Sequence, residues 1–272
     1  MIAVVLARGE GRRMRHPEDA ATLTAAQAEA AAAGRKAMMP LGAREGGRPF
    51  LDYVLASLRA AGCDHVCLVV APDNVDIRQR YLRDHPPRAL RVDFVNQETA
   101  SGTADAALAA EAVTGDLPFL VLNSDNLYPV EALRDLVALQ GPGLPTFARD
   151  DLVKESNIPP SRIADFALLD VDDDGWLRRI VEKPDAKTLA AFGDNPLVSM
   201  NAWRFDRRIF PACRDVPLSM RGERELPGAV ALALERGVPF RAVPARGAVL
   251  DLSRRGDIAE VSRRLAGAEI DL

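Results

Sequence analysis

The sequence predicts an α/β fold in which a mostly parallel mixed sheet is covered by helices on both faces. Short β-branched runs alternate along the chain with segments of helical periodicity, the pattern of strands joined by crossover helices. The 272 residues suffice for one substantial core, and 48% are apolar against 27% charged, as in ordinary globular proteins. No long linker or internal repeat divides the chain, so we expect a single domain over residues 1–272.

In the first half, four apolar runs predict the strands of a parallel sheet, at residues 2–6, 66–70, 92–95 and 119–122. The helix expected at 50–61 repeats apolar residues at helical spacing and ends at Gly62. Further helices are expected at 73–83 and 103–112. Ligands of open α/β sheets sit beyond the carboxyl ends of the strands, so the loops after the first, third and fourth strands are where we expect chemistry.

The second half is richer in strands. Residues 166–170 and 177–181 flank the turn Asp172-Asp173-Asp174-Gly175 and predict a hairpin. The remaining expected elements are a single strand at 198–205, a helix at 223–235, a short strand at 240–243 and a helix at 256–265. This half is expected to form a β-rich lobe attached to the first sheet.

Residues 23–33 stand outside this pattern. They are rich in alanine and follow Thr22 and Thr24, either of which suits a helix N-cap. We expect a surface helix inserted in a loop, with a mobile lid as the alternative. Cys63 and Cys67 flank a predicted buried strand and are expected to be inert core thiols.

Composition argues against several classes of protein. The net charge of -4 is unlike that of a general nucleic-acid binder, which is basic overall. No apolar run approaches the ~20 residues that a membrane span needs, and the first residues lack the charged start of a signal peptide. We therefore expect a cytoplasmic protein with neither a nucleic acid nor a membrane as partner.

A glycine turn follows the first strand. Gly9 and Gly11 allow backbone amides to approach a triphosphate, and arginines such as Arg13 supply positive charge. The turn lacks the third glycine of the dinucleotide-binding fingerprint, and the Walker A motif is also missing. By itself the turn fits a sharp bend with solvated arginines equally well.

Other polar residues lie at later strand ends. Gln97 follows the third strand, and Gly102 and Thr103 open a helix, whose N-terminus favours a phosphate or a polar base edge. Asp125 follows the fourth strand, and Mg²⁺ binds one or two such carboxylates together with phosphate oxygens. Asp251 lies in an apolar stretch, where a charge needs a partner; a metal shared with Asp125 would be one.

In order and placement, these motifs resemble those of the sugar-1-phosphate nucleotidyltransferases, which include glucose-1-phosphate thymidylyl- and uridylyltransferases and mannose-1-phosphate guanylyltransferases. The family's G-G-x-G-T-R-[LM], K-x-x-x-P, G-D-N, E-K-P, R-G-E-x-E-L and W-L-D-x-G appear, with substitutions, at residues 8–14, 36–40, 124–126, 182–184, 221–226 and 249–253. The resemblance covers nearly the whole chain. It implies a Rossmann-like fold of the nucleotide-diphospho-sugar transferase type, with a nucleotide-binding half at 1–130 and a sugar-phosphate-binding half at 131–272.

The resemblance also implies a reaction. A sugar 1-phosphate attacks the α-phosphorus of a nucleoside triphosphate in line, giving a nucleoside-diphosphate sugar and pyrophosphate. The residues implied to bind the nucleotide are Leu6, Ala7, Gly9, Gly11, Gln97, Gly102 and Thr103. Arg13, Lys36 and Lys183 are the implied catalytic residues.

On the sugar side, the implied contacts to the sugar phosphate are Glu182, Lys183, Asn201 and Arg221. Asp125 and Asp251 are implied to bind Mg²⁺ as cofactor. Family members often form dimers or tetramers, so a homo-oligomer is among the expected assemblies. The amide of Gln97 offers a donor and an acceptor, which favours thymine, uracil or guanine over adenine.

Some positions depart from the family pattern. Arg8 and Arg12 replace a glycine and a threonine in the turn, and Ser124 replaces the glycine before the metal aspartate. Two alternatives stay open: a nucleotidyltransferase for another phosphate acceptor (a polyol or cyclitol phosphate, or molybdopterin), and a catalytically silent regulatory homologue. A metal-dependent glycosyltransferase would use an Asp-x-Asp motif, which the acidic turn at 172–174 supplies only formally.

Overall fold

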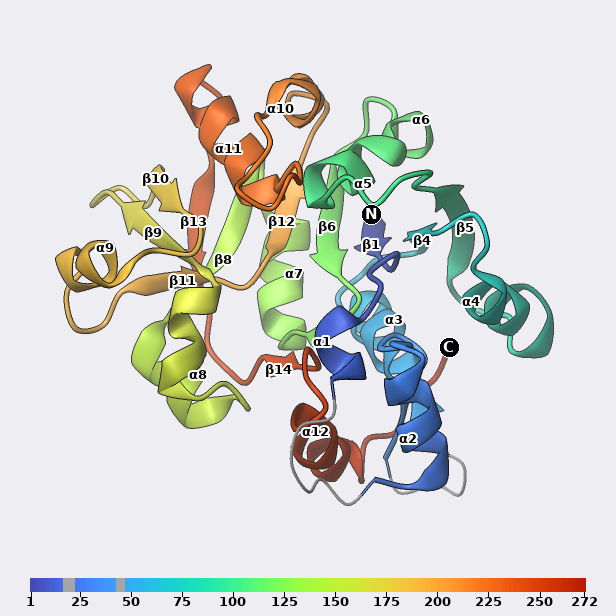
Figure 1. Cartoon of the computed structure of the whole chain (residues 1–272). Coiled ribbons are helices and arrows are strands. Elements are labelled where there is room, and N and C mark those ends of the chain that lie inside the picture. The colour runs from blue at the N-terminus through green and yellow to red at the C-terminus, as the bar shows by residue number, and fades with distance from the viewer. Residues whose placement is uncertain (17–22, 43–46) are drawn as a thin grey trace.

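A mixed sheet forms the centre of the computed structural model, which describes residues 1–16, 23–42 and 47–272 (Figure 1). The order of its strands is β10-β9-β11-β8-β12-β6-β1-β4-β5, with β13 paired to β8. These strands are β1 (Ile2–Leu6), β4 (His65–Val70), β5 (Arg91–Asn96), β6 (Phe119–Asn123), β8 (Gly143–Ala148), β9 (Ala167–Val171), β10 (Leu177–Val181), β11 (Leu197–Ser199), β12 (Ala202–Phe205) and β13 (Arg241–Pro244). The predicted α/β class is confirmed.

The strands of the first half are parallel, because β1 pairs in parallel with both β4 and β6, and β4 with β5. Strand β1 is buried along its whole length, and its side chains pack into the apolar core on both faces of the sheet. Ala3 and Val5 point into one apolar cluster, and Val4 points into the other. Such a strand shows no polar alternation, which is why its sequence reads as a continuous apolar run.

Helices cover both faces of the sheet. On one face lie α3 (Phe50–Ala60) and α7 (Val130–Ala138), and on the other α5 (Thr103–Ala109), α10 (Ile209–Asp215) and α11 (Leu226–Glu235). The other helical segments are α1 (Arg12–Arg15), α2 (Ala25–Ala32), α4 (Val75–Gln79), a π-helical turn (Arg80–Asp84), α6 (Glu111–Thr114), α8 (Arg149–Glu155), a 3₁₀ segment (Pro160–Asp165), α9 (Ala186–Ala191) and α12 (Asp257–Leu265). Two short ribbons pair β2 (Pro40–Leu41) with β3 (Arg48–Pro49), and β7 (Asn126–Leu127) with β14 (Leu250–Asp251).

The expectation of one strand at 198–205 is wrong. The chain leaves β11 and re-enters the sheet as β12, which pairs with β6 and β8 instead of β9. The break lies at Asn201, whose φ of 59° is left-handed and incompatible with a continuous strand. The predicted hairpin is present as β9 and β10, at one end of the sheet (Figure 1).

The inserted segment forms a packed helix. Thr24 caps α2 through a reciprocal pair of hydrogen bonds with Gln27, as one of the two N-cap candidates predicted, while Thr22 lies outside the described residues. Ala30 and Ala31 are buried, and α2 lies beside α1 (Figure 1). The expectation of an inserted helix is therefore confirmed, and its burial against the fold favours it over a lid.

The three cysteines are free and buried. Burial raises the pKa of Cys63, Cys67 and Cys213 to about 12 in each case, so the thiolate form is scarce near neutral pH. The expectation of inert core thiols at Cys63 and Cys67 agrees with this burial. Among the described residues, no helix has the length and apolar character that spanning a bilayer requires.

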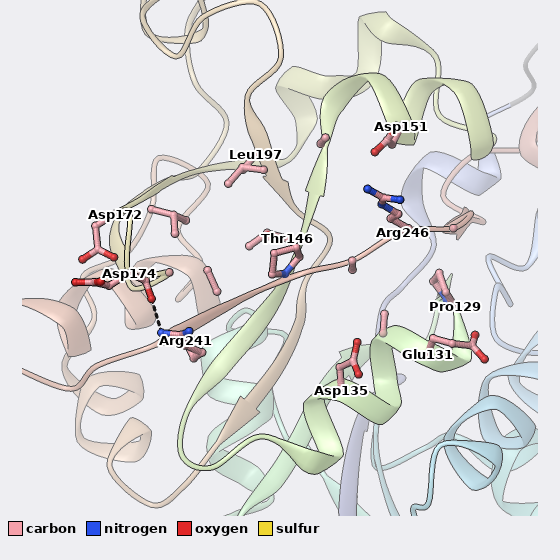
Figure 2. Close-up of a pocket in the computed structure, with 18 of the residues that line it drawn as sticks. Pro129, Glu131, Asp135, Thr146, Asp151, Asp172, Asp174, Leu197, Arg241 and Arg246 are labelled. Atoms are coloured by element: carbon pink, nitrogen blue, oxygen red, sulfur yellow. Dashed lines mark hydrogen bonds between the residues drawn. The ribbon is translucent and has the colours of Figure 1, made fainter.

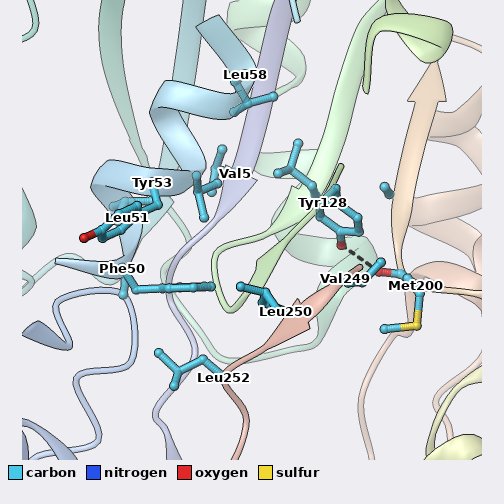
Figure 3. Packing of buried hydrophobic residues seen from close by; sticks show 14 of the residues in the cluster. Val5, Phe50, Leu51, Tyr53, Leu58, Tyr128, Met200, Val249, Leu250 and Leu252 are labelled. Carbon is cyan, nitrogen blue, oxygen red and sulfur yellow. Dashed lines mark hydrogen bonds between the residues drawn. The ribbon is translucent and has the colours of Figure 1, made fainter. Parts of the chain in front are cut away.

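A buried hydrogen bond ties the first sheet half to the break between β11 and β12. The hydroxyl of Tyr128 donates to the carbonyl oxygen of Met200 over 2.6 Å, next to the apolar side chains of β14 and its neighbours (Figure 3). Burial raises the pKa of Tyr128 well above its usual value, and the nearby Asp125 and Asp251 raise it further. The hydroxyl therefore stays protonated and remains a donor.

Tyr128→Phe should lower the free energy of unfolding by about 1–2 kcal/mol, because it leaves the buried Met200 carbonyl without its donor. Urea denaturation monitored by circular dichroism measures this change. A midpoint equal to that of the wild type, at equal m-value, would show that the bond contributes nothing to stability.

Candidate functional site

The residues predicted to bind the nucleotide meet at the carboxyl edge of the sheet, next to several of the predicted catalytic, metal and sugar-phosphate residues. They line one open cavity of about 600 Å³. Its walls include the predicted residues Leu6, Ala7, Gly9, Gly11, Arg13, Lys36, Gln97, Gly102, Thr103, Asp125 and Arg221. Backbone hydrogen bonds fix this edge, since Ser124 N donates to Leu6 O and Gln97 N donates to Val70 O.

The glycine turn has two distinct positions. Gly11 has a φ of 62°, and a Cβ there would lie 2.2 Å from the carbonyl oxygen of Gly34, so the local structure requires glycine. A Cβ on Gly9 would meet nothing within 4 Å, and Gly9 lines the cavity. Glycine at position 9 thus leaves space on the cavity side for a ligand to approach the backbone.

Side chains and backbone also connect the loops around this cavity. Arg8 Nε donates to the carbonyl oxygen of Gln97 over 2.8 Å and so joins the glycine turn to the loop after β5. Arg8, which replaces a family glycine, therefore has a structural role that the sequence did not predict. The backbone makes a second connection at Gly102, which has a φ of 110° and packs so closely that a Cβ there would lie 2.3 Å from the Arg224 carbonyl oxygen.

Two cationic side chains lie on the wall of this cavity. Lys36 Nζ is 3.0 Å from Asp125 Oδ2, and both side chains are largely buried. Arg13 lies on α1 and reaches both this cavity and its neighbour, and within the described residues it forms no ion pair. Lys36 and Arg13 thus lie on the same cavity as the glycine turn, and the guanidinium of Arg13 has no carboxylate partner in the described chain.

A second cavity of about 220 Å³ adjoins the first and shares Arg13, Asp125 and Arg221 with it. It is lined by the predicted sugar-side and metal residues, namely Asp125, Glu182, Lys183, Asn201, Arg221 and Asp251. Lys183 and Asn201 are the two non-glycine residues with positive φ in the described chain, at 46° and 59°. Such conformations cost about 1 kcal/mol or more and cluster at ligand sites.

Glu182 holds a carboxylate oxygen without a partner. Its Oε1 lies 3.3 Å from Lys183 Nζ, whereas its buried Oε2 has no hydrogen-bond partner in the described chain. Burial raises the pKa of Glu182, and Glu225 raises it further, against the opposing effect of Lys183. A buried acceptor of this kind suits a ligand hydroxyl.

Glu225 organises the two cations of this cavity. Its Oε1 accepts from Arg221 Nε over 3.1 Å and lies 3.8 Å from Lys183 Nζ. The sequence placed Glu225 only inside a motif and assigned it no role. Its carboxylate keeps Lys183 and Arg221 together on the wall of the same cavity.

Asp251 has a protein partner that the sequence did not predict. Arg162 Nη2 donates to Asp251 Oδ1 over 2.7 Å, the backbone N of Ser253 donates to the same oxygen, and Asn126 Nδ2 donates to Oδ2 over 3.1 Å. Asp251 and Arg162 are 2% and 5% exposed. Asp251 is therefore stabilised by an ion pair even without a metal, and Arg162 is a residue of the site that sequence reasoning missed.

The carboxylates of Asp125 and Asp251 form a donor set that fits Mg²⁺. The β7–β14 ribbon brings them together, because Asp251 pairs with Asn126 and Leu252 N donates to Asp125 O over 2.8 Å. In the described chain no donor reaches Asp125 Oδ1, and Asp251 Oδ2 accepts one hydrogen bond. Among the described residues no group of three or more His, Cys, Asp or Glu side chains is placed to hold a metal ion. Mg²⁺ usually takes one or two protein carboxylates and completes its shell with phosphate oxygens and water.

The Asp172–Asp174 turn lies elsewhere. It lines a third cavity of about 910 Å³, together with residues of α7 and with Asp151 and Arg246 (Figure 2). Arg241 donates to the carbonyl oxygen of Asp174 there. The Asp-x-Asp pattern of this turn is thus separate from Asp125 and Asp251, which argues against the glycosyltransferase alternative.

Gly11→Ala should lower the free energy of unfolding by about 2 kcal/mol or more, because it adds left-handed strain and a clash with Gly34. Gly9→Ala is the matched control and should leave the thermal midpoint unchanged, because its methyl group enters open space. Scanning calorimetry of both variants decides this, and equal losses of stability would contradict the distinction between the two glycines.

The fold is shared with solved structures. UDP-glucose pyrophosphorylase complexed with UDP-glucose superposes with a TM-score of 0.73 at 17% identity, covering 97% of each chain. UTP-bound UGPase from Acinetobacter baumannii superposes with a TM-score of 0.72 at 19% identity, covering 97% of this chain and 92% of that one. These likenesses establish the type of fold.

Sequence relatives extend the comparison. The chain is 29% identical over 263 residues to a glucose-1-phosphate thymidylyltransferase of Streptomyces antibioticus, and 28% identical over 273 residues to the UTP--glucose-1-phosphate uridylyltransferase AglF of Haloferax volcanii. It is 26% identical over 230 residues to the low-salt glycan biosynthesis nucleotidyltransferase Agl11 of the same archaeon. These matches cover 97%, 97% and 85% of this chain, and 65%, 96% and 60% of the respective relatives. The family model of the nucleotidyl transferases matches residues 2–266, so the chain belongs to that family, as its motifs predicted.

Proposed function

We propose that the chain transfers a nucleotidyl group from a nucleoside triphosphate to a sugar 1-phosphate, releasing pyrophosphate. One observation carries the proposal: two adjoining cavities share Arg13, Asp125 and Arg221. The larger presents the open glycine turn with Lys36, as a triphosphate requires. The smaller presents Lys183 and Arg221 beside the unpartnered oxygen of Glu182, which suits a phosphate attached to a hydroxyl-rich group.

The mechanism follows from this arrangement. A phosphate monoester is already ionised near neutral pH, so the attacking oxygen needs no general base. Lys183 and Arg221 orient the sugar phosphate from one side, and Arg13 and Lys36 stabilise the negative charge of the departing pyrophosphate on the other. Catalysis then rests on positioning and charge neutralisation, as in phosphoryl transfer generally.

Mg²⁺ is the proposed cofactor, held by Asp125 and Asp251 together with phosphate oxygens. Bound there, it would offset repulsion between the two anionic substrates, an effect worth several kcal/mol in transition-state stabilisation. Arg162 supports this role by holding Asp251 in one orientation through their 2.7 Å hydrogen bond.

The relatives named for thymidylyl and uridylyl transfer support a pyrimidine triphosphate as the nucleotide donor. The three buried free thiols agree with the cytoplasmic location expected from the sequence.

Asp125→Asn should retain the thermal midpoint within a few degrees and reduce kcat at least about a hundredfold, because it removes a charge at the point where the cavities meet. Pyrophosphate release at saturating Mg²⁺ measures this. Asp116→Asn is the control, since in the described part of the chain its exposed carboxylate pairs with the exposed Arg207. Near-native turnover of the Asp125→Asn variant would remove Asp125 from the proposed metal site.

The pH dependence of sugar-phosphate use tests Glu182. Its carboxylate must be ionised to accept a sugar hydroxyl strongly, and because burial raises its pKa, protonation begins at a higher pH than for an ordinary glutamate at about 4.3. As pH falls, kcat/KM for the sugar 1-phosphate should therefore decline more steeply in the wild type than in Glu182→Gln. Titration of the substrate phosphate affects both proteins alike, so parallel profiles would contradict this role.

A further inference from the structure

The carboxylate of Asp251 is engaged unequally at its two oxygens. Arg162 Nη2 and Ser253 N both donate to Oδ1, whereas Oδ2 accepts one hydrogen bond, from Asn126 Nδ2 over 3.1 Å. The backbone of Asp251 is fixed separately, because its N donates to Asn157 Oδ1 and its carbonyl oxygen accepts from Asn157 Nδ2. A carboxylate oxygen can accept twice, so Oδ2 keeps one position for a further ligand.

Arg162 holds Asp251 from a guanidinium that also pairs with a second carboxylate. Its Nη1 donates to Asp257 Oδ1 over 3.1 Å, on the nitrogen next to the one that reaches Asp251. Asp165 is more distant, with Oδ2 3.9 Å from Arg162 Nε, and it accepts a hydrogen bond from Arg254. A guanidinium is planar and its donors form a rigid fork, so the position of Asp257 sets the direction from which Arg162 meets Asp251.

Asp257 is itself anchored on the backbone that follows Asp251. It is the first residue of α12, and its Oδ2 accepts from the N of Ser253 over 3.0 Å and of Arg254 over 2.7 Å. Among the described residues, those that line the two substrate cavities do not include Asp257. Its effect on a ligand must therefore pass through Arg162 and through the backbone at 253–254.

This arrangement also determines how much charge Asp251 retains. An arginine paired with Asp251 alone would offset most of its negative charge and weaken its attraction for a cation. Arg162 instead faces both Asp251 and Asp257, and two carboxylates against one guanidinium leave an excess of negative charge. Asp257 thus supplies part of the charge that Arg162 would otherwise remove from Asp251.

On this basis, and resting on the proposed nucleotidyl transfer with a metal at Asp125 and Asp251, we propose that Asp257 is a positioning residue for the metal ligand Asp251. It fixes Arg162 and the backbone after Asp251, which together hold the Asp251 side chain with Oδ2 open. It also keeps the charge of Asp251 available to a divalent cation.

Calorimetry tests the proposal without requiring turnover. The affinity for UTP is measured with and without Mn²⁺ in the absence of any sugar 1-phosphate, and the ratio of the two affinities reports the contribution of the metal site. Asp257→Asn should lower this ratio about tenfold, the scale on which residues that orient metal ligands act. The affinity for UTP without Mn²⁺ should stay within about twofold of the wild type, because Asn retains an oxygen that can accept from the backbone at 253–254.

The matched control is Glu260→Gln, which removes the same charge from the same helix. In the described chain, Glu260 forms ion pairs with Arg263 and Arg264 of α12. Its substitution should leave the ratio unchanged. A second variant, Arg162→Lys, keeps the positive charge but loses the rigid fork that joins the two carboxylates, and it should also lower the ratio about tenfold.

The outcomes separate the possible failures. A wild-type ratio in either folded variant, Asp257→Asn or Arg162→Lys, overturns the role of Asp257 and leaves nucleotidyl transfer standing. An equal loss of UTP affinity with and without Mn²⁺ overturns it as well, because it shows general damage to the fold. If Mn²⁺ does not change the affinity of the wild type for UTP, the proposed metal site is wrong, and this inference fails with it.

Absence of binding by every common nucleoside triphosphate, with or without Mn²⁺, overturns the proposed function itself.

Discussion

Register in the parallel part of the sheet governs where the glycine turn and Asp125 lie relative to each other. Leu6 pairs with Asn123 on one side and with Val69 on the other, so β1, β4 and β6 end at the same level. The glycine turn and Asp125 therefore emerge side by side, although more than a hundred residues separate them in the chain. A shift of one residue in β1 would exchange the residues of its two faces and move the turn away from Asp125.

Charge is distributed so that few groups of the site are buried unpaired. Lys36 pairs with Asp125, Arg162 with Asp251, and Glu225 with both Lys183 and Arg221. Arg162 and Asp251 are both buried, so removing one of them would leave the other uncompensated, at a cost of about 3–5 kcal/mol. The other pairs are partly exposed, and their loss costs less. The site thus holds a dense group of paired charges. Within the described residues Glu182 Oε2 and Asp125 Oδ1 accept no hydrogen bond and Arg13 forms no ion pair, so these groups have capacity left for a ligand.

The sequence allowed prediction of those features that depend on local pattern. Continuous apolar runs identified the parallel strands, and ionisable residues at their ends identified the cavity walls. Features that depend on distant contacts were not predictable. Strand β8 contains Pro145 and begins at Gly143, residues that weaken any strand pattern, and the run at 198–205 gives no sign of its break at Asn201. Arg162 approaches Asp251 from 89 positions away, and no spacing rule could pair them.

The central claim is that the two cavities hold two anionic substrates that react with each other. A pyrophosphate-release screen that crosses the common nucleoside triphosphates with a panel of sugar 1-phosphates, with and without Mg²⁺, tests it most directly. The account predicts release that requires both substrates and Mg²⁺. Pyrophosphate release with a triphosphate alone, or with none of the sugar 1-phosphates, would contradict it.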